Sequence, residues 1–187
     1  KRPILGTYAQ GSSWFTWLAD DQKFLADRQD VLKWQTDVLT EDVSVTGEIM
    51  AHLFASTSGS DSDWIVKLID VYPAENQPDP KLENYQLMVA SEIFRGRYRK
   101  SFAKAEAIEP DKVNEYSIDM RSNNYTFKKG HRIMVQVQSS WFPLYDRNPQ
   151  KFVDNIFKAE ESDYQTATQK IYHSTKFPSH ISVSISN

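Results

Sequence analysis

The chain has 187 residues, of which 40% are hydrophobic and 13% aromatic, and its formal net charge at pH 7 is −3. This composition suits the core of one domain and excludes a chain that is disordered throughout, while the acidic balance argues against a dedicated nucleic-acid-binding protein. The absence of cysteine excludes disulfides, thiolate metal sites and a cysteine nucleophile, and no apolar run is long enough to predict a membrane-spanning helix.

The N-terminal part has no clear strand pattern. Lys1–Ile4 contains neither an initiator Met nor the apolar core of a signal peptide, which favours a piece of a longer chain. Further along, the spacing of Leu18–Arg28 predicts a short helix with Leu18, Phe24 and Leu25 facing inward.

Alternation of apolar and polar residues with period two dominates from residue 43 onward and predicts strands. The predicted strands are Val43–Thr46, Ile49–Ser56, Trp64–Val71, Tyr85–Phe94, Asn114–Met120, Tyr125–Phe127, Ile133–Val137 and Ile181–Ile185. The third of these is apolar on both faces, which is typical of a strand covered on both sides. Eight strands with few helical patterns predict an all-β fold, an antiparallel sandwich or jelly roll.

The connections carry their own signals. Pro73–Lys81, rich in proline, is predicted to form a long surface loop, and Lys128–Gly130 a turn. Asn148-Pro149 resembles a helix cap followed by proline at the first helical position, which predicts a second helical turn. The loop Ser139–Gln150 contains four large apolar side chains, and because loops are usually polar, these side chains need cover.

A search for catalytic motifs finds none. No G-x-S-x-G nucleophile elbow occurs. The four histidines, His52, His131, His173 and His180, form neither H-x-x-x-H nor H-E-x-x-H, so neither a metal site nor a cofactor is predicted. A Ser/His/Asp triad assembled from distant residues stays possible in principle, since serines and acids are numerous.

Two polar clusters each have two interpretations. Asp61-Ser62-Asp63 has the form of a calcium ligand pair, but no glutamate follows at EF-hand distance; a polar turn before the next strand is favoured. Arg95, Arg97 and Arg99 would lie on one face of a strand and could bind phosphates. In an acidic chain, a solvated face or ion pairs with another domain are favoured.

Several long phrases resemble one known family. These are SGSDSDWIVKLIDVYP (Ser58–Pro73), IFRGRYRKSF (Ile93–Phe102), KKGHRIMVQVQSSWFPLYDRNPQ (Lys128–Gln150) and FPSHISVSI (Phe177–Ile185). They are similar to the C-terminal jelly roll, a galactose-binding-domain-like sandwich, of the X-Pro dipeptidyl-peptidase, cocaine esterase and α-amino acid ester hydrolase family. Leu18–Gly47 resembles the acylase-like members, among them glutaryl-cephalosporin acylases.

The resemblance implies a longer parent enzyme, secreted or periplasmic, in which an α/β-hydrolase domain and a helical cap domain are the partners of this chain. In that family the catalytic Ser, Asp and His lie in the α/β-hydrolase domain, so no catalytic residue is assigned here and the isolated chain is expected to be inactive. Residues 1–40 would be an arm and linker from the catalytic domain, and residues 41–187 the jelly roll. A small acyl substrate in the parent and a homo-oligomer are compatible with the resemblance, whereas nucleic acid is not expected.

The resemblance also suggests site residues. The stretch after Pro3–Gly6 leads from the catalytic domain into the jelly roll in relatives and can supply apolar groups to the acyl pocket. The candidates for the substrate pocket or the domain interface are Tyr8, Trp14, Phe15 and Trp17 in the arm, and Trp141, Phe142, Tyr145 and Arg147 in the later loop.

The rival hypothesis is a carbohydrate-binding module. Such sandwiches stack sugars on exposed aromatic side chains, and Trp14, Trp17, Trp34 and Trp141 lie outside the clearest predicted strands. The alternative for each is burial, because tryptophan is mostly covered in folded proteins.

Overall fold

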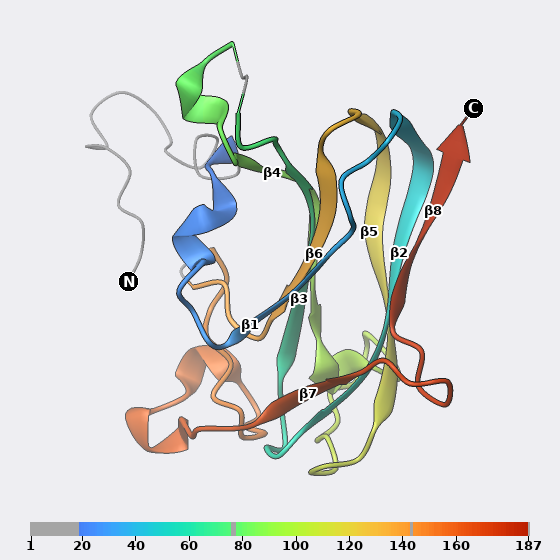
Figure 1. Ribbon diagram of the computed structural model, residues 1–187. Helices are drawn as coiled ribbons and strands as arrows, with labels where there is room; N and C mark the ends of the chain where they lie inside the picture. Colours follow the sequence, from blue (N-terminus) through green and yellow to red (C-terminus); the bar gives the residue numbers. More distant parts are fainter. Residues whose placement is uncertain (1–18, 76–77, 143, 187) are drawn as a thin grey trace.

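Two antiparallel sheets packed face to face form the body of the protein (Figure 1). The computed structural model describes residues 19–75, 78–142 and 144–186. One sheet has the strand order β1-β6-β3-β4; in the other, β2 lies beside β5, and β7 and β8 pair with successive parts of its second edge. The strands are β1 (Val31–Gln35), β2 (Val43–Thr57), β3 (Asp63–Val71), β4 (Gln86–Arg95), β5 (Asn114–Phe127), β6 (Arg132–Gln138), β7 (Gln169–Tyr172) and β8 (His180–Ser186). The predicted all-β sandwich is confirmed.

The main core lies between the sheets. On β3, Trp64, Val66 and Leu68 face inward and pack against residues of β2 and β5, while Ile65 and Ile69 on the opposite face are also buried. The prediction that this strand is covered on both sides is therefore confirmed. A second layer must lie on the outer face of the β1-β6-β3-β4 sheet.

Strands β2 and β5 are each continuous where the sequence predicted two separate strands. Their pairing slips between Glu48 and Met50. Gly47 on β2 has φ 97° and Arg121 on β5 has φ 72°, so each strand has one residue with a positive φ angle near the register shift. Such a bulge interrupts the alternation of faces without ending the strand, which is why the pattern suggested a break.

Strands β1 and β7 were missed. β1 is a five-residue edge strand paired only with β6, and it leaves Leu32 and Trp34 partly exposed, so its apolar residues do not alternate. β7 has four residues, too few for a period to show. Because β1 lies within residues 1–40, the sandwich begins before the expected boundary at residue 41.

The helical segments are shorter than predicted. Within Leu18–Arg28 the structure has the 3₁₀ turn Gln22–Leu25 (η2), which is capped by Asp21. Leu25 is buried as predicted, but Phe24 is largely exposed, and Leu18 lies outside the described residues. The other 3₁₀ turns are η3 (Pro80–Leu82), η4 (Gly96–Tyr98), η5 (Ile156–Lys158) and η6 (Glu161–Asp163).

The helical turn predicted at Asn148-Pro149 is wrong. The Asn148 side chain does accept a hydrogen bond from the Gln150 backbone N–H at 2.8 Å, as a cap would. Gln150, however, takes a left-handed φ of 63°, which turns the chain away from a helical path. Within the described part of the chain, no helix is long and apolar enough to cross a membrane.

Candidate domain-docking face

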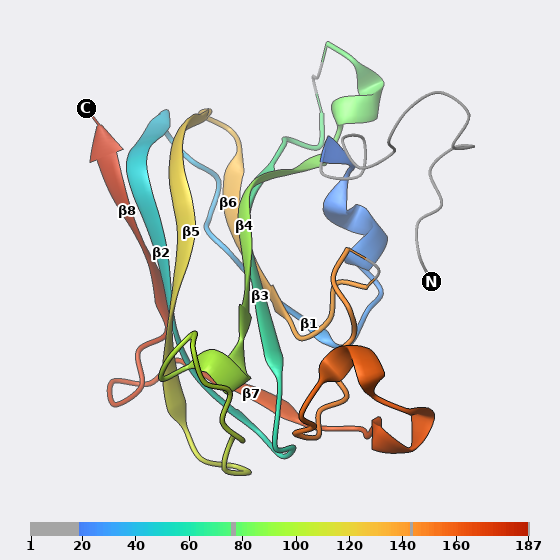
Figure 2. The ribbon, with the colours of Figure 1, turned by 180° about the vertical axis from the view of Figure 1, so that it is seen from behind.

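A second layer covers the outer face of the β1-β6-β3-β4 sheet. It consists of η2, the loop of residues 139–142 and 144–150 (the Trp141 loop), and the following segment with η5 and η6. Both ribbon views place these elements on the side of this sheet that faces away from β5, β2 and β8 (Figures 1 and 2).

Trp141 fastens its loop to the sheet. It is only 7% exposed and packs with Ile65 of β3, and Tyr145 packs against the same cluster. The Tyr145 N–H donates to the Trp141 carbonyl at 3.0 Å, so the loop folds back on itself. The apolar side chains of this loop therefore divide into two groups: Trp141 and Tyr145 cover the domain's own sheet, whereas Phe142 is 56% exposed.

A buried lysine lies beneath this cover. Lys67 points outward from β3 yet is fully buried. Its Nζ donates to Gln22 Oε1 at 2.7 Å and lies 4.1 Å from the centre of the Trp141 ring. Burial lowers the pKa of Lys67 to about 7, because removing an ammonium from water disfavours its charged form. Our sequence analysis missed this group, although a single lysine in the apolar run WIVKLIDV was the available signal.

The Asp61–Asp63 turn forms a second anchor. Arg97 donates to Asp61 Oδ2 through Nε at 2.9 Å and Nη2 at 2.6 Å, and also to the Val153 carbonyl at 2.9 Å. Asn148 donates to Asp63 Oδ1 at 2.9 Å. These side chains are buried, and desolvation raises the pKa of Asp63 to about 6. The favoured turn is present, and its carboxylates hold the Trp141 loop and the residues after it.

A close backbone contact supports the same anchor. The Ser60 N–H donates to the Gln150 carbonyl at 3.1 Å, and a Cβ at Gly59 would lie 2.2 Å from that carbonyl oxygen. Only glycine permits this approach. Among the described residues, no group of three or more His, Asp or Glu is placed to hold a metal ion.

The arginine row is not a strand face, which corrects our sequence interpretation. β4 ends at Arg95, and Gly96–Tyr98 forms η4. Gly96 allows this bend because a Cβ there would lie 2.8 Å from the Ser62 carbonyl oxygen. Arg97 turns inward to Asp61, and Arg99 donates to backbone carbonyls, including that of Glu106 at 2.9 Å. The ion pairing favoured from the sequence exists, but within this domain.

The second layer carries four exposed aromatic side chains and one arginine, and we call this set the aromatic face. Phe142, Phe157, Tyr164 and Phe24 are 56%, 77%, 36% and 41% exposed. The Arg147 guanidinium carbon lies 4.9 Å from the centre of the Tyr164 ring and 5.7 Å from that of Phe142. Phe142, Tyr164 and Arg147 therefore form one exposed cluster, and clustered exposed apolar groups are typical of protein contact sites.

The remaining predicted site residues, Tyr8, Trp14, Phe15 and Trp17, lie outside the described residues. The Ala19 carbonyl, near the start of the described chain, accepts a hydrogen bond from the Tyr85 hydroxyl. The described chain therefore begins beside β4, on the side of the sheet that carries the second layer (Figure 1).

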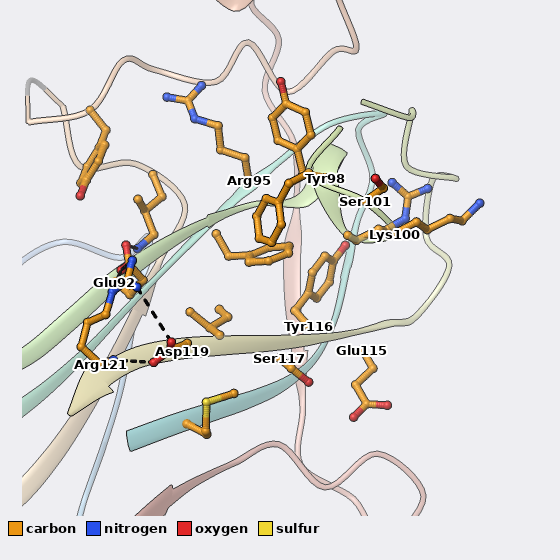
Figure 3. A pocket seen from close by; sticks show the side chains of 17 residues that line it. Glu92, Arg95, Tyr98, Lys100, Ser101, Glu115, Tyr116, Ser117, Asp119 and Arg121 are labelled. Carbon is orange, nitrogen blue, oxygen red and sulfur yellow. Dashed lines mark hydrogen bonds and ion pairs between the residues drawn. The ribbon is translucent and has the colours of Figure 1, made fainter. Parts of the chain in front are cut away.

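A separate hollow lies between β4 and β5 (Figure 3). It has a volume of about 1030 Å³ and contains side chains of both charges. Arg121 spans its end and pairs with Glu92 at 3.1 Å. Its described lining contains Ser101 and Ser117 but no histidine, so it lacks the nucleophile–base pair of acyl transfer.

These features define a class: an accessory β-sandwich domain that presents a rigid aromatic face. Across the described residues no serine or threonine hydroxyl is hydrogen-bonded to a histidine; His131 bonds to Asp70 and His180 to the Pro178 carbonyl. The family model described as the X-Pro dipeptidyl-peptidase C-terminal non-catalytic domain matches residues 8–182, and the chain belongs to this family.

Similar proteins agree with this assignment. Cocaine esterase from Rhodococcus sp. (strain MB1 Bresler) is 39% identical over 162 residues, which are 86% of this chain and 26% of that protein. The crystal structure of an aminopeptidase from a marine sediment Thaumarchaeota archaeon matches with a TM-score of 0.95 and 53% identity, over 100% of this chain and 31% of that one. An α-amino acid ester hydrolase structure matches with a TM-score of 0.94 and 50% identity, over 100% and 30%. The chain thus spans less than a third of these proteins.

Proposed function

We propose that this chain is the noncatalytic β-sandwich domain of a serine hydrolase, and that it completes and rigidifies the substrate pocket of its parent enzyme. The parent would transfer an acyl group to water through a serine nucleophile of an α/β-hydrolase domain. Its substrates would be peptides, amides or esters, such as X-Pro dipeptides, α-amino acid esters or β-lactam side-chain amides. The names of the similar aminopeptidase and ester hydrolases support the peptides and esters in this range.

The observation that carries the proposal is the aromatic face on its anchored support. A mobile surface loop would lose conformational entropy on docking, whereas a loop fixed by buried contacts has already lost it. The packing of Trp141 on the sheet, the hydrogen bond of Asn148 to Asp63, and that of the Ser60 N–H to the Gln150 carbonyl fix the loop. Phe142 and its neighbours can therefore present a preformed surface to the catalytic and cap domains.

The N-terminal arm would also contribute to the substrate pocket. The described chain begins beside β4, on the side of the sheet that carries the second layer, and this is the side on which the parent's other domains would dock. We propose that Tyr8, Trp14, Phe15 and Trp17 supply apolar groups to the acyl pocket, as the family resemblance implies. The chemistry itself would belong to the parent's other domains.

The test is made in the full-length enzyme. Trp17→Ala should change the preference between a small and a bulky acyl group, because a lost pocket contact is worth a factor of roughly 10 to 200 in kcat/KM. Trp34→Ala serves as the matched control, since Trp34 lies on the edge strand β1. A ratio of the two kcat/KM values that stays the same in Trp17→Ala would contradict the pocket role of this residue.

The carbohydrate-binding alternative gains no support from Trp64 or Trp141. Both are buried in the two apolar clusters, whereas Trp34 on β1 is 39% exposed. A stacking platform needs a freely accessible ring face, which neither buried ring offers.

A further inference from the structure

The arginines of this domain differ in whether they have polar partners. Of the seven that the structure describes, six have polar partners. Four pair with carboxylates: Arg28 with Asp30, Arg95 with Asp63 at 4.0 Å, Arg97 with Asp61, and Arg121 with Glu92. Two donate to backbone carbonyls: Arg99 to Glu106 and Arg132 to Thr36. Within the described chain, Arg147 alone has neither kind of partner and contacts only the rings of Phe142 and Tyr164.

Arg147 is nevertheless held in place. Phe142 belongs to the Trp141 loop, whereas Tyr164 caps the end of η6, so two separate segments hold the guanidinium. The next residue, Asn148, is anchored on Asp63, and the Gln165 N–H after Tyr164 donates to the Pro149 carbonyl at 3.1 Å. An exposed arginine usually samples many rotamers, and this one is restrained.

The chemistry of the restrained group indicates its partner. A guanidinium that stacks on aromatic faces keeps its N–H groups at the edge of its plane, where a carboxylate can accept two of them. The nearby acid Asp163 already pairs with Lys151 at 2.8 Å and caps η6. The cation therefore has open donors, a fixed orientation and an apolar surround, which together are typical of the central contacts of protein interfaces.

We propose that Arg147 receives an Asp or Glu carboxylate from the catalytic part of the parent chain, as a bidentate pair at the centre of the aromatic face. This inference rests on the proposed function, because it names the contact through which the domain docks. The rings of Phe142 and Tyr164, which lie against the guanidinium, would exclude water from the pair, and a desolvated pair is stronger than a solvated one.

The experiment compares hydrogen exchange in the full-length parent and in the 187-residue chain. The variants are Arg147→Gln, Arg147→Lys and, as a matched control, Arg121→Gln, which removes an exposed arginine of β5 that already pairs with Glu92. In the parent, amides of residues 144–164 should exchange more slowly than in the isolated chain. Arg147→Gln should remove at least about 30-fold of that protection, since truncating one member of a buried, hydrogen-bonded charge pair has an effect of this size.

Further results complete the expected pattern. Arg147→Lys should keep part of the protection, because lysine retains the charge but loses the planar fork, and Arg121→Gln should behave as the parent does. In the isolated chain, Arg147→Gln should change exchange by less than about fivefold, the size expected from losing exposed cation–π contacts alone.

The outcomes separate the inference from the proposed function. Protection in the parent that survives Arg147→Gln would overturn the carboxylate pair and leave the docking intact. An equal loss in the isolated chain would also overturn it, because Arg147 would then act only within the domain. No protection of this face in the parent would count against the proposed function itself. Protection in the isolated chain that grows with concentration would identify a second copy as the occupant and overturn the inference.

Discussion

Replacing Lys67 with Met tests whether burial controls the charge of this lysine. The pKa of Lys67 is lowered from 10.5 to about 7 in the folded domain. The unfolded chain therefore binds this proton more readily than the folded one, so folded-state stability falls as pH falls from about 10.5 to about 7 and then stays level. Methionine has a similar length and no charge, and this pH-dependent loss should be absent from the Lys67→Met variant.

The size of this pH-dependent loss of stability follows from the difference between the folded and unfolded pKa values of Lys67. A difference of 3.5 pKa units corresponds to about 5 kcal/mol over the whole range. Between pH 9 and pH 6 the linkage relation gives about 2–3 kcal/mol. The substitution also removes the donor to Gln22 Oε1, which costs about 1–3 kcal/mol at every pH. The stability of Lys67→Met relative to wild type should therefore rise by about 2–3 kcal/mol from pH 9 to pH 6, whatever its sign at pH 9.

The assay is urea unfolding of the 187-residue chain at pH 6, 7.5 and 9, followed by tryptophan fluorescence and circular dichroism. Other titrating groups are common to both proteins and cancel in the difference. Lys104→Met is the control, because Lys104 is 77% exposed beside Glu106 and its removal should give a flat difference. A flat profile for Lys67→Met as well would refute the argument that burial sets the charge of Lys67.

Two further predictions concern the docking loop and catalysis. Gly59→Ala should destabilise the chain by about 1–3 kcal/mol or more, because its Cβ would lie 2.2 Å from the Gln150 carbonyl oxygen. The control Ser122→Ala changes an exposed residue and should alter the stability by no more than about 0.5 kcal/mol. Equal unfolding midpoints for the two variants would contradict the close contact at Gly59. The isolated chain should not hydrolyse p-nitrophenyl acetate or an X-Pro-anilide faster than serum albumin, because the proposed nucleophile and oxyanion hole belong to another domain. Turnover that a serine-directed inhibitor abolishes would refute this.

The sequence by itself determined the fold class and the covered state of β3. Period-two alternation is a local property, since neighbouring side chains on a strand point to opposite faces. An apolar strand on both faces, WIVKLIDV, therefore indicated two covering layers before either was known. The long phrases from Ser58 to Ile185 likewise carried the family resemblance, which the family match confirms.

Only the tertiary structure decided which charged groups are buried and with whom. Gly96 bends the chain so that Arg97 reaches Asp61, and the Trp141 loop closes over Lys67, which lies far from it in the sequence. The sequence around Arg97 and Arg147 does not distinguish their environments, yet Arg97 is buried with a carboxylate and Arg147 stacks on two rings. Local patterns report the direction of a side chain, whereas its neighbours come from distant segments brought together by the packing of the sheets and loops.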